Sequence, residues 1–174
     1  MVDKVSKIYA VAIFEIATEE DKILSILELL DGMKELYETN IEFKEFMKNP
    51  LIKKEQKLDM IKKICSEAKD IEQEIMLYLV RKNRLDEISN IAYEYRELYY
   101  SKENIVGIKG IFSMELSVEQ KAKLIEKLEK ITNKKINFEQ EIDPKLIGGG
   151  ILKIGDKILD GSIRTQLAQM AKGE

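Results

Sequence analysis

The residues of this chain that could do chemistry are few, and the usual acid–base side chain is missing. The sequence contains no His, which removes the commonest general base and every Ser-His or Cys-His pair. Its single Cys, Cys65, allows neither an intramolecular disulfide nor a CxxC metal site. Cys65 shares helical spacing with Leu58 and Ile61, which predicts a small buried side chain rather than a reactive thiol. We therefore expect no catalytic residue, no metal and no cofactor.

Three consecutive glycines, Gly148 to Gly150, are the feature that most suggests nucleotide binding. A phosphate-binding loop needs Lys followed by Ser or Thr directly after its last glycine, to hold phosphate and magnesium. Here Ile151 and Leu152 follow, and the pattern continues as a strand. The glycines instead predict a turn or bulge that enters a β-hairpin.

The other polar candidates fit structural roles. Carboxylate pairs such as Glu19–Glu20 lie in polar stretches, whereas a general acid needs burial to raise its pKa. Asp160 and Ser162 precede a helical pattern, and their side chains are expected to accept hydrogen bonds from free N–H groups there. Arg164 follows this cap. It could pair with Asp160 or Asp156 within the fold, which we favour, or with an acidic partner surface.

Composition limits the classes of protein that remain. The 174 residues are enough for one domain or two small ones, and 44% of them are hydrophobic. The net charge of -3 argues against general binding to nucleic acid, which needs a surplus of Lys and Arg. The start of the chain does not resemble a signal peptide. The longest apolar run, Ile8 to Phe14, is shorter than the roughly 20 residues that span a membrane, so we expect membrane association only through partners.

Hydrophobic residues up to about Asn104 recur with helical spacing, and after Asn104 they begin to alternate. The fold class predicted is an N-terminal all-α six-helix bundle, residues 1–104, followed by a small α+β domain, residues 105–174. Besides the first and fifth helices, the predicted helices of the bundle run from about Glu20 to Asn40, Glu42 to Lys48, Lys54 to Ala68 and Leu85 to Lys102.

The second domain is predicted to contain four strands and two helices. The strands lie near Val106–Gly110, Ile136–Ile142, Ile151–Ile154 and Lys157–Leu159, and the helices open at Ser117 and Ser162. Gln120, three residues after Ser117, completes a capping box. Gly155-Asp156 is a two-residue turn between the last two strands, with glycine in the first position.

The first and fifth helices carry apolar side chains on every side. The first includes Ile8 to Ala17, with Glu15 as its one charged residue, and the fifth includes Ile75 to Val80. Two explanations stay open at this point. Both helices could lie at the centre of the bundle, or a groove between them could bind an apolar helix of another protein. The alanines of the first helix would let such a helix approach closely.

Several of these segments, in this order, resemble the delta subunit of bacterial F-type ATP synthases, the counterpart of the mitochondrial oligomycin-sensitivity-conferring protein. Tyr9–Phe14 resembles the family's first helix, Phe46–Pro50 its Phe-Leu-x-Asn-Pro turn, and Leu79–Leu85 the stretch that ends its fifth helix. The most specific similarity is Ile142–Ile151 with the segment that follows it. Its signature residues, to which we assign structural roles, are Gly148, Gly149, Gly155, Asp156, Asp160, Gly161, Ser162 and Arg164. Ile8 departs from the family, whose members commonly have Arg there.

The resemblance implies a non-catalytic stator subunit that links the catalytic alpha/beta head to the peripheral stalk, so that rotor torque is coupled to ATP synthesis or hydrolysis. It implies that the bundle binds the N-terminal helix of an alpha subunit between the first and fifth helices. The second domain would contact the b subunits of the stalk, and the protein would lie peripherally at the cytoplasmic face of the cell membrane. Our candidates for the alpha contact are Tyr9, Ala10, Ile13, Ala17, Tyr78 and Leu79.

Two other classes of function are weighed against this one. A cytosolic helical adaptor that binds an amphipathic helix of another complex would explain the apolar helices but not the C-terminal signature. A small transferase using the glycine-rich turn would lack His, a phosphate motif and buried acid pairs. Co-purification with alpha and b subunits would distinguish the stator subunit from the adaptor. A melting temperature raised by nucleotides or coenzyme A derivatives would favour the transferase.

Overall fold

The chain divides into two compact units, with the boundary between Tyr99 and Tyr100, close to the boundary expected at residue 104. The computed structural model describes residues 4–66, 68, 70–155, 157–163 and 165. The first unit is helical and the second combines helix and sheet, which confirms the predicted fold class.

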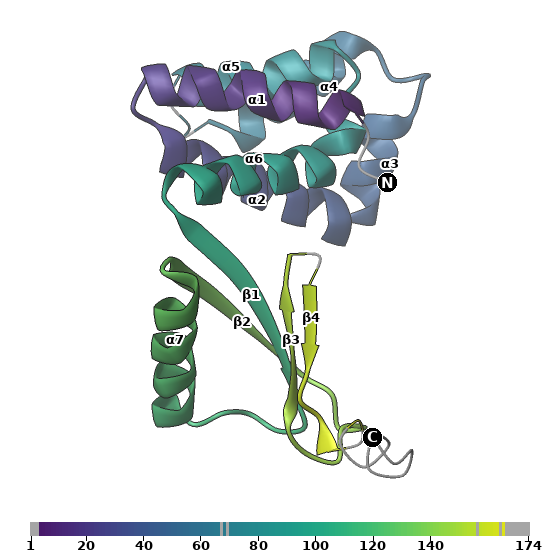
Figure 1. The fold of residues 1–174 in the computed structure, drawn as a ribbon. Helices are drawn as coiled ribbons and strands as arrows, with labels where there is room; N and C mark the ends of the chain where they lie inside the picture. The colour runs from purple at the N-terminus through teal and green to yellow at the C-terminus, as the bar shows by residue number, and fades with distance from the viewer. Residues whose placement is uncertain (1–3, 67, 69, 156, 164, 166–174) are drawn as a thin grey trace. The chain divides into compact units, whose positions relative to one another are not determined.

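Six α-helices and one short 3-10 helix make up the described part of the first unit (Figure 1). They are α1 (Lys4–Glu19), α2 (Ile23–Thr39), α3 (Ile41–Lys48), α4 (Lys54–Ile64), α5 (Asp70–Arg81), η1 (Leu85–Glu87) and α6 (Ile88–Lys102). The bounds of α3 lie within one residue of the prediction. The largest differences are three: α2 begins at Ile23 rather than near Glu20, α4 ends at Ile64 rather than Ala68, and α6 begins at Ile88 rather than Leu85, because the 3-10 helix η1 precedes it.

The late start of α2 has a local cause. Asp21 adopts a left-handed backbone conformation, with φ of 54°. The N–H of Lys22 donates to the carbonyl of Ala17 at 2.8 Å, and the N–H of Asp21 donates to Thr18 at 3.4 Å. This pair of bonds is the Schellman arrangement that closes a helix, usually around glycine. Asn83 ends α5 in the same way, with Arg84 bonded to Leu79 at 2.9 Å.

The core of the first unit contains side chains from all six helices, and Tyr95 of α6 is one of its fully buried members. The ring of Phe14 contacts that of Tyr95 edge-on, with centroids 5.3 Å apart. The Tyr95 hydroxyl donates to the carbonyl of Ile23 at 3.0 Å, which ties α6 to the first turn of α2. Burial raises the pKa of Tyr95, so this hydroxyl stays protonated at neutral pH.

We expect Tyr95→Phe to lower the free energy of unfolding by about 1 kcal/mol at pH 7, because it removes one hydrogen bond and little else. Since the folded state raises the pKa of this group, its protonated form contributes stability below the unfolded pKa of about 10 and loses it at higher pH. Urea unfolding at pH 7 and above pH 10 should show a smaller pH-dependent loss in Tyr95→Phe than in the wild type. An equal loss of stability in both proteins would show that the buried Tyr95 hydroxyl is not the group that titrates.

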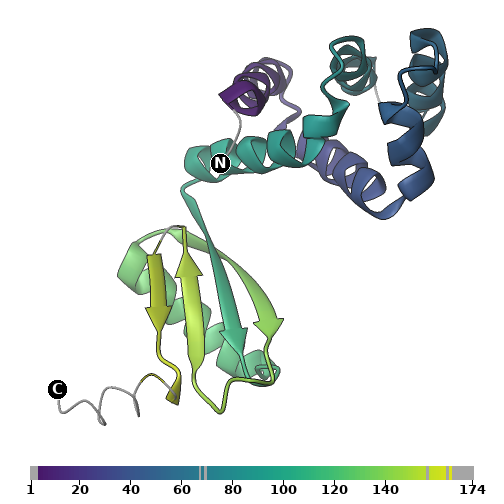
Figure 2. The ribbon, with the colours of Figure 1, turned by 90° about the vertical axis from the view of Figure 1, so that its right-hand side faces the viewer.

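In the part that the structure describes, the second unit is a four-stranded mixed sheet with one helix on one face (Figure 2). Its elements are β1 (Ile105–Phe112), α7 (Val118–Thr132), β2 (Lys135–Ile142), β3 (Gly150–Ile154) and β4 (Lys157–Asp160), in the sheet order β2-β1-β3-β4. Strands β1 and β2 are parallel, so the chain between them crosses through α7. The other two pairs are antiparallel.

The core of the second unit lies between α7 and the sheet, around Ile108, Leu128 and Phe138. The predicted capping box is present, because Ser117 Oγ accepts from the N–H of Gln120 at 3.2 Å and the Gln120 side chain accepts from Ser117 at 2.9 Å. These bonds satisfy two donors at the start of α7 and so fix where the helix begins.

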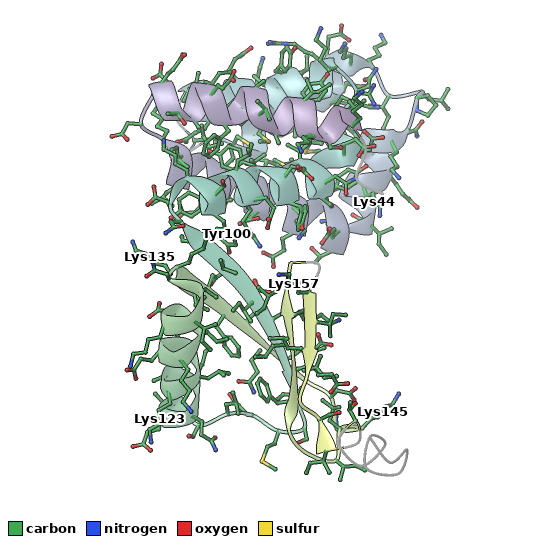
Figure 3. All side chains as sticks on the ribbon, viewed as in Figure 1. Lys44, Tyr100, Lys123, Lys135, Lys145 and Lys157 are labelled. Carbon is green, nitrogen blue, oxygen red and sulfur yellow. The ribbon has the colours of Figure 1, made fainter. Side chains whose placement is uncertain are left out.

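Tyr100, labelled in Figure 3, lies in the last turn of α6, whose final three residues belong to the second unit. Its hydroxyl accepts a hydrogen bond from the side-chain amide of Asn137 on β2. Its ring lies against Gly107 of β1, where a Cβ would come within 3.2 Å of the ring. The absence of a side chain at Gly107 therefore leaves the space that the Tyr100 ring uses.

Candidate docking surface

The structure places the six predicted partner-contact residues on α1 and α5, but in two different environments. Ala10, Ile13 and Ala17 of α1 and Leu79 of α5 are buried in the core of the helical unit. Tyr9 is half-buried, and Tyr78 is 46% exposed. In this structure only the two tyrosines present surface to a partner.

Other apolar side chains of α1 are exposed, and they form a row. Ile8 is 63% exposed, Ile16 is 39% exposed, and Ala12 between them is also exposed. Residues four apart lie along one side of a helix, so these three share a stripe.

Helix α5 lies beside α1 (Figures 1 and 2). The rings of Tyr9 and Tyr78 join the two helices, with centroids 6.3 Å apart. Lys82 places its ammonium 5.4 Å from the centroid of the Tyr78 ring, at the edge of this surface. We call the set Ile8, Tyr9, Ala12, Ile16 and Tyr78 the α1/α5 apolar face.

The pattern of residue sizes on α1 explains why the exposed side chains are the large ones. Its buried side consists of Ser6, Ala10, Ile13 and Ala17, three of which are small. The Ser6 hydroxyl, fully buried, donates to a carboxylate oxygen of Glu87 at 3.0 Å. Small residues let α1 approach its own unit closely, which leaves Ile8 and Ile16 on the outside. The sequence signal for this orientation was Ser6, which shares a face with the alanines.

The glycine signature of the second unit, Gly148–Gly150 with Gly161, lets two segments of backbone lie close together. The N–H of Gly161 donates to the carbonyl of Gly150 at 2.9 Å, and that of Ile163 donates to Gly148 at 3.0 Å. Gly149 has φ of 77°, and a Cβ there would lie 2.3 Å from the carbonyl oxygen of Gly161. The space beside the glycines is therefore filled by the chain itself.

Asp160 and Ser162 organise the same corner. One carboxylate oxygen of Asp160 accepts from the N–H of Ser162 at 2.9 Å, and the other accepts from the Thr165 hydroxyl at 2.7 Å. These hydrogen bonds, led by the backbone bond from Ser162, hold the pKa of Asp160 below its usual range. Ser162 Oγ in turn accepts from the N–H of Thr165 at 3.4 Å.

Three expectations reach beyond this corner. The predicted turn after β3 begins at Gly155, which has φ of 55°. Asp156 and Arg164 lie outside the described residues, as does most of the helix expected after Ser162, so the expected pairing of Arg164 is untested.

The second unit also exposes apolar side chains. β4 is an edge strand of the sheet, and Ile158 and Leu159 on it are both exposed. Val118 and Ile131, near the two ends of α7, are exposed as well. Exposed apolar groups gathered on one element are typical of contact surfaces.

The thiol and carboxylate groups of the described residues show no arrangement typical of a catalytic or metal site. Cys65 is buried, and burial raises the pKa of its thiol, which favours the unreactive protonated form. No cluster of Cys, Asp or Glu side chains in the described part of the chain could hold a metal ion. Among the helices that the structure describes, none is long and apolar enough to cross a membrane.

The comparisons with known proteins agree over nearly the full chain. The family model described as "ATP synthase delta (OSCP) subunit" matches residues 5–173. The chain is 47% identical to the sodium-ion-specific ATP synthase subunit delta of Propionigenium modestum, with 97% of each chain covered. It is 45% identical to ATP synthase subunit delta of Fusobacterium nucleatum, again with 97% of each covered. A chain in the mitochondrial ATP synthase of Toxoplasma gondii shares the fold, with a TM-score of 0.77, 19% identity, and 98% of this chain and 97% of that one covered.

A helical unit with an exposed apolar helix face, joined to a small α+β unit with an exposed apolar edge strand, defines a protein that works by contact with other proteins. The chain belongs to the ATP synthase delta (OSCP) subunit family, which confirms the resemblance read from its sequence. It is a non-catalytic stator subunit and part of the ATP synthase complex.

Proposed function

We propose that the α1/α5 apolar face binds the N-terminal helix of an alpha subunit, and that the second unit binds the b subunits of the peripheral stalk. The chain then links the catalytic head to the stalk and prevents the head from turning with the rotor. It is held peripherally at the cytoplasmic face of the cell membrane through these partners.

The observation that carries the proposal is the row of large apolar side chains on α1. Ile8 and Ile16 lie on the outside of a helix whose opposite side is fully packed. Burying one such side chain contributes about 1.5–3 kcal/mol. An amphipathic helix laid along α1 and α5 would cover both isoleucines and the exposed part of Tyr78, which is the helix-in-groove mode of recognition.

The second unit offers a different surface for the stalk. Ile158 and Leu159 on edge strand β4 are exposed. The α1/α5 apolar face and β4 lie in separate units of the chain, so one partner can bind each without competing for residues. A linker under load needs slow dissociation at both contacts, which buried apolar anchors supply more readily than exposed charge pairs.

The alpha contact is tested by calorimetric titration of the full chain with a peptide of the alpha subunit's N-terminus, roughly 20 residues long, enough for an amphipathic helix. We expect Ile8→Asp and Ile16→Asp each to weaken binding by about tenfold or more, because each loses an apolar anchor and leaves a carboxylate against an apolar partner. Leu24→Asp is the matched control, since Leu24 is an exposed apolar residue on α2 and lies outside the proposed surface. It should bind the peptide as the wild type does.

The result can also contradict the proposal. No binding by a well-folded chain, or equal weakening by Ile16→Asp and Leu24→Asp, would refute the α1/α5 apolar face as the alpha contact. Co-purification of the chain with alpha and b subunits tests the wider link. Recovery of some other complex in their place would favour the adaptor alternative.

A further inference from the structure

A cavity of about 560 Å³ lies at the end of the helical unit where α3, α4 and α5 come together. The segment between α3 and α4, the first turn of α4, the end of α5 and the start of η1 form its walls. Its lining residues are Tyr37, Met47, Lys48, Pro50, Ile52, Lys53, Lys54, Lys57, Val80, Asn83, Leu85 and Asp86. No residue of the α1/α5 apolar face is among them, so the cavity is independent of the function proposed above.

The charge of the lining is strongly positive. Lys48, Lys53, Lys54 and Lys57 contribute four ammonium groups, against the single carboxylate of Asp86. The rest of the lining is largely apolar. An apolar floor with a few convergent charged groups is the usual construction of a small-molecule site, and the volume lies in the usual range of roughly 300–1,000 Å³.

Two of the four ammonium groups are held in place. Lys54 Nζ donates to the carbonyl oxygen of Arg81 at 2.6 Å, and Lys57 Nζ donates to that of Met47 at 2.7 Å. These carbonyls belong to the last turns of α5 and α3, where helix dipoles favour positive charge. An ammonium group has three N–H donors, so each lysine keeps further donors for a ligand. Fixing a long side chain in advance lowers the entropy that binding would cost.

Besides the lysines, the Tyr37 hydroxyl independently indicates a ligand in this cavity. Its side chain is only 4% exposed, yet it lines the cavity. The described residues provide no hydrogen-bond partner for its hydroxyl. Every fully buried side-chain N or O atom among the described residues has a hydrogen-bond partner. Since the Tyr37 hydroxyl has none among these residues, it is not fully buried and keeps some access to solvent. The cavity that Tyr37 lines is the open space beside it. Burial, and then the negative charge of Asp86, raise the pKa of Tyr37, so the hydroxyl is a donor at neutral pH.

We infer that this cavity binds a small phosphate-bearing anion, with Lys53, Lys54 and Lys57 on its phosphate oxygens and the Tyr37 hydroxyl as an additional donor. The same chemistry is offered by an inorganic polyphosphate and by the phosphate tail of a nucleotide. The inference concerns binding alone, with no bond made or broken.

The test is calorimetric titration of the full chain with inorganic phosphate, pyrophosphate and ATP, without metal and at constant ionic strength, because salt screens exposed charges. We expect saturable binding of one pyrophosphate per chain. The double variant Lys53→Gln/Lys54→Gln should weaken it by about tenfold or more, as loss of charge-assisted hydrogen bonds does. The matched control is Lys123→Gln/Lys127→Gln, which removes two exposed lysines of α7 and should leave binding unchanged. ATP binding tighter than pyrophosphate indicates a nucleotide, and equal binding indicates the polyphosphate alone.

Tyr37→Phe keeps the proposal falsifiable if loss of the Lys54 bond to Arg81 destabilises the end of α5. It removes only a hydroxyl for which the described residues provide no partner, so stability should hold while pyrophosphate binding weakens several-fold. No saturable binding of any of the three anions at millimolar concentration overturns the inference. Equal weakening by the α7 control pair, or binding of a Glu-rich peptide in place of pyrophosphate, overturns it too. Ile16→Asp should bind pyrophosphate normally, so this result is separable from that of the alpha-peptide titration.

Discussion

Leu79→Asp is expected to unfold the helical unit, whereas Tyr78→Asp at the neighbouring position leaves it folded. Leu79 is fully buried in the core of the unit, and Tyr78 is nearly half exposed on the same helix. Both changes place a carboxyl group in the last turn of α5, where the helix dipole disfavours negative charge in either variant. They differ in what happens to the carboxylate, which Leu79→Asp places among apolar side chains and Tyr78→Asp leaves in water.

The size of the effect follows from two additive costs. Removing most of a buried Leu costs about 2–5 kcal/mol through lost transfer energy and the cavity left behind. Burying a carboxyl group without a partner adds a further cost of about 1–3 kcal/mol even in its neutral form. Total stabilities of about 5–15 kcal/mol leave little margin for such a loss. Tyr78→Asp should cost about 1 kcal/mol, chiefly through the lost contact with the Tyr9 ring.

Urea unfolding followed by circular dichroism measures both variants, and hydrogen exchange shows which unit has opened. If Leu79→Asp unfolds with the wild-type midpoint, the placement of α5 in the core is wrong. The two variants also show which substitutions can test partner binding. Loss of alpha-peptide binding in Leu79→Asp or Ile13→Asp would report unfolding rather than a contact, because both residues are buried. Substitutions at Ile8, Ile16 and Tyr78 separate the two effects.

Periodicity predicted the α-helices and strands that the structure describes, although not the 3-10 helix η1. Helical spacing identified α3 to within one residue, and the alternation from Ile136 to Ile142 identified β2. The predicted start of α2 was wrong because a residue other than glycine ends the helix before it. Asp21 closes α1 in a left-handed conformation that sequence patterns attribute first to glycine, and the predicted α2 therefore began too early.

The surface was harder to predict than the elements, because hydrophobic type does not state which side of a helix is inward. Alanines in α1 suggested close approach of a guest helix, but Ala10 and Ala17 give that close approach to the unit's own core. The orientation depends on which residues six helices can pack together, a property of their joint arrangement. The lysine-lined cavity was missed for a similar reason, since Lys48, Lys57 and Asp86 come from three separate elements.

The glycine signature leads to the other large expected effect. Gly149→Ala should destabilise the second unit by about 3 kcal/mol or more, because two costs combine at this position. Its φ of 77° is unfavourable for any residue with a Cβ, at about 1–2 kcal/mol. The new Cβ would also lie 2.3 Å from the carbonyl oxygen of Gly161, a contact that only movement of the backbone can relieve. That movement would break the hydrogen bond from Gly161 to Gly150 that closes the corner.

Gly155→Ala provides the matched control, since it isolates the first cost from the second. Gly155 also has a positive φ, of 55°, but apart from its chain neighbours no atom of the described residues lies within 4 Å of the position that its Cβ would occupy. It should therefore lose only about 1–2 kcal/mol. Thermal unfolding of the two variants, with hydrogen exchange read at β3 and β4, measures the difference. If the two alanines cost the same, backbone conformation alone explains the glycines, and close approach of the segments around Gly149 and Gly161 is not what the signature preserves. A larger loss at Gly149 would mean that the signature preserves a structural contact within the second unit, with no need for a bound phosphate to explain the three consecutive glycines.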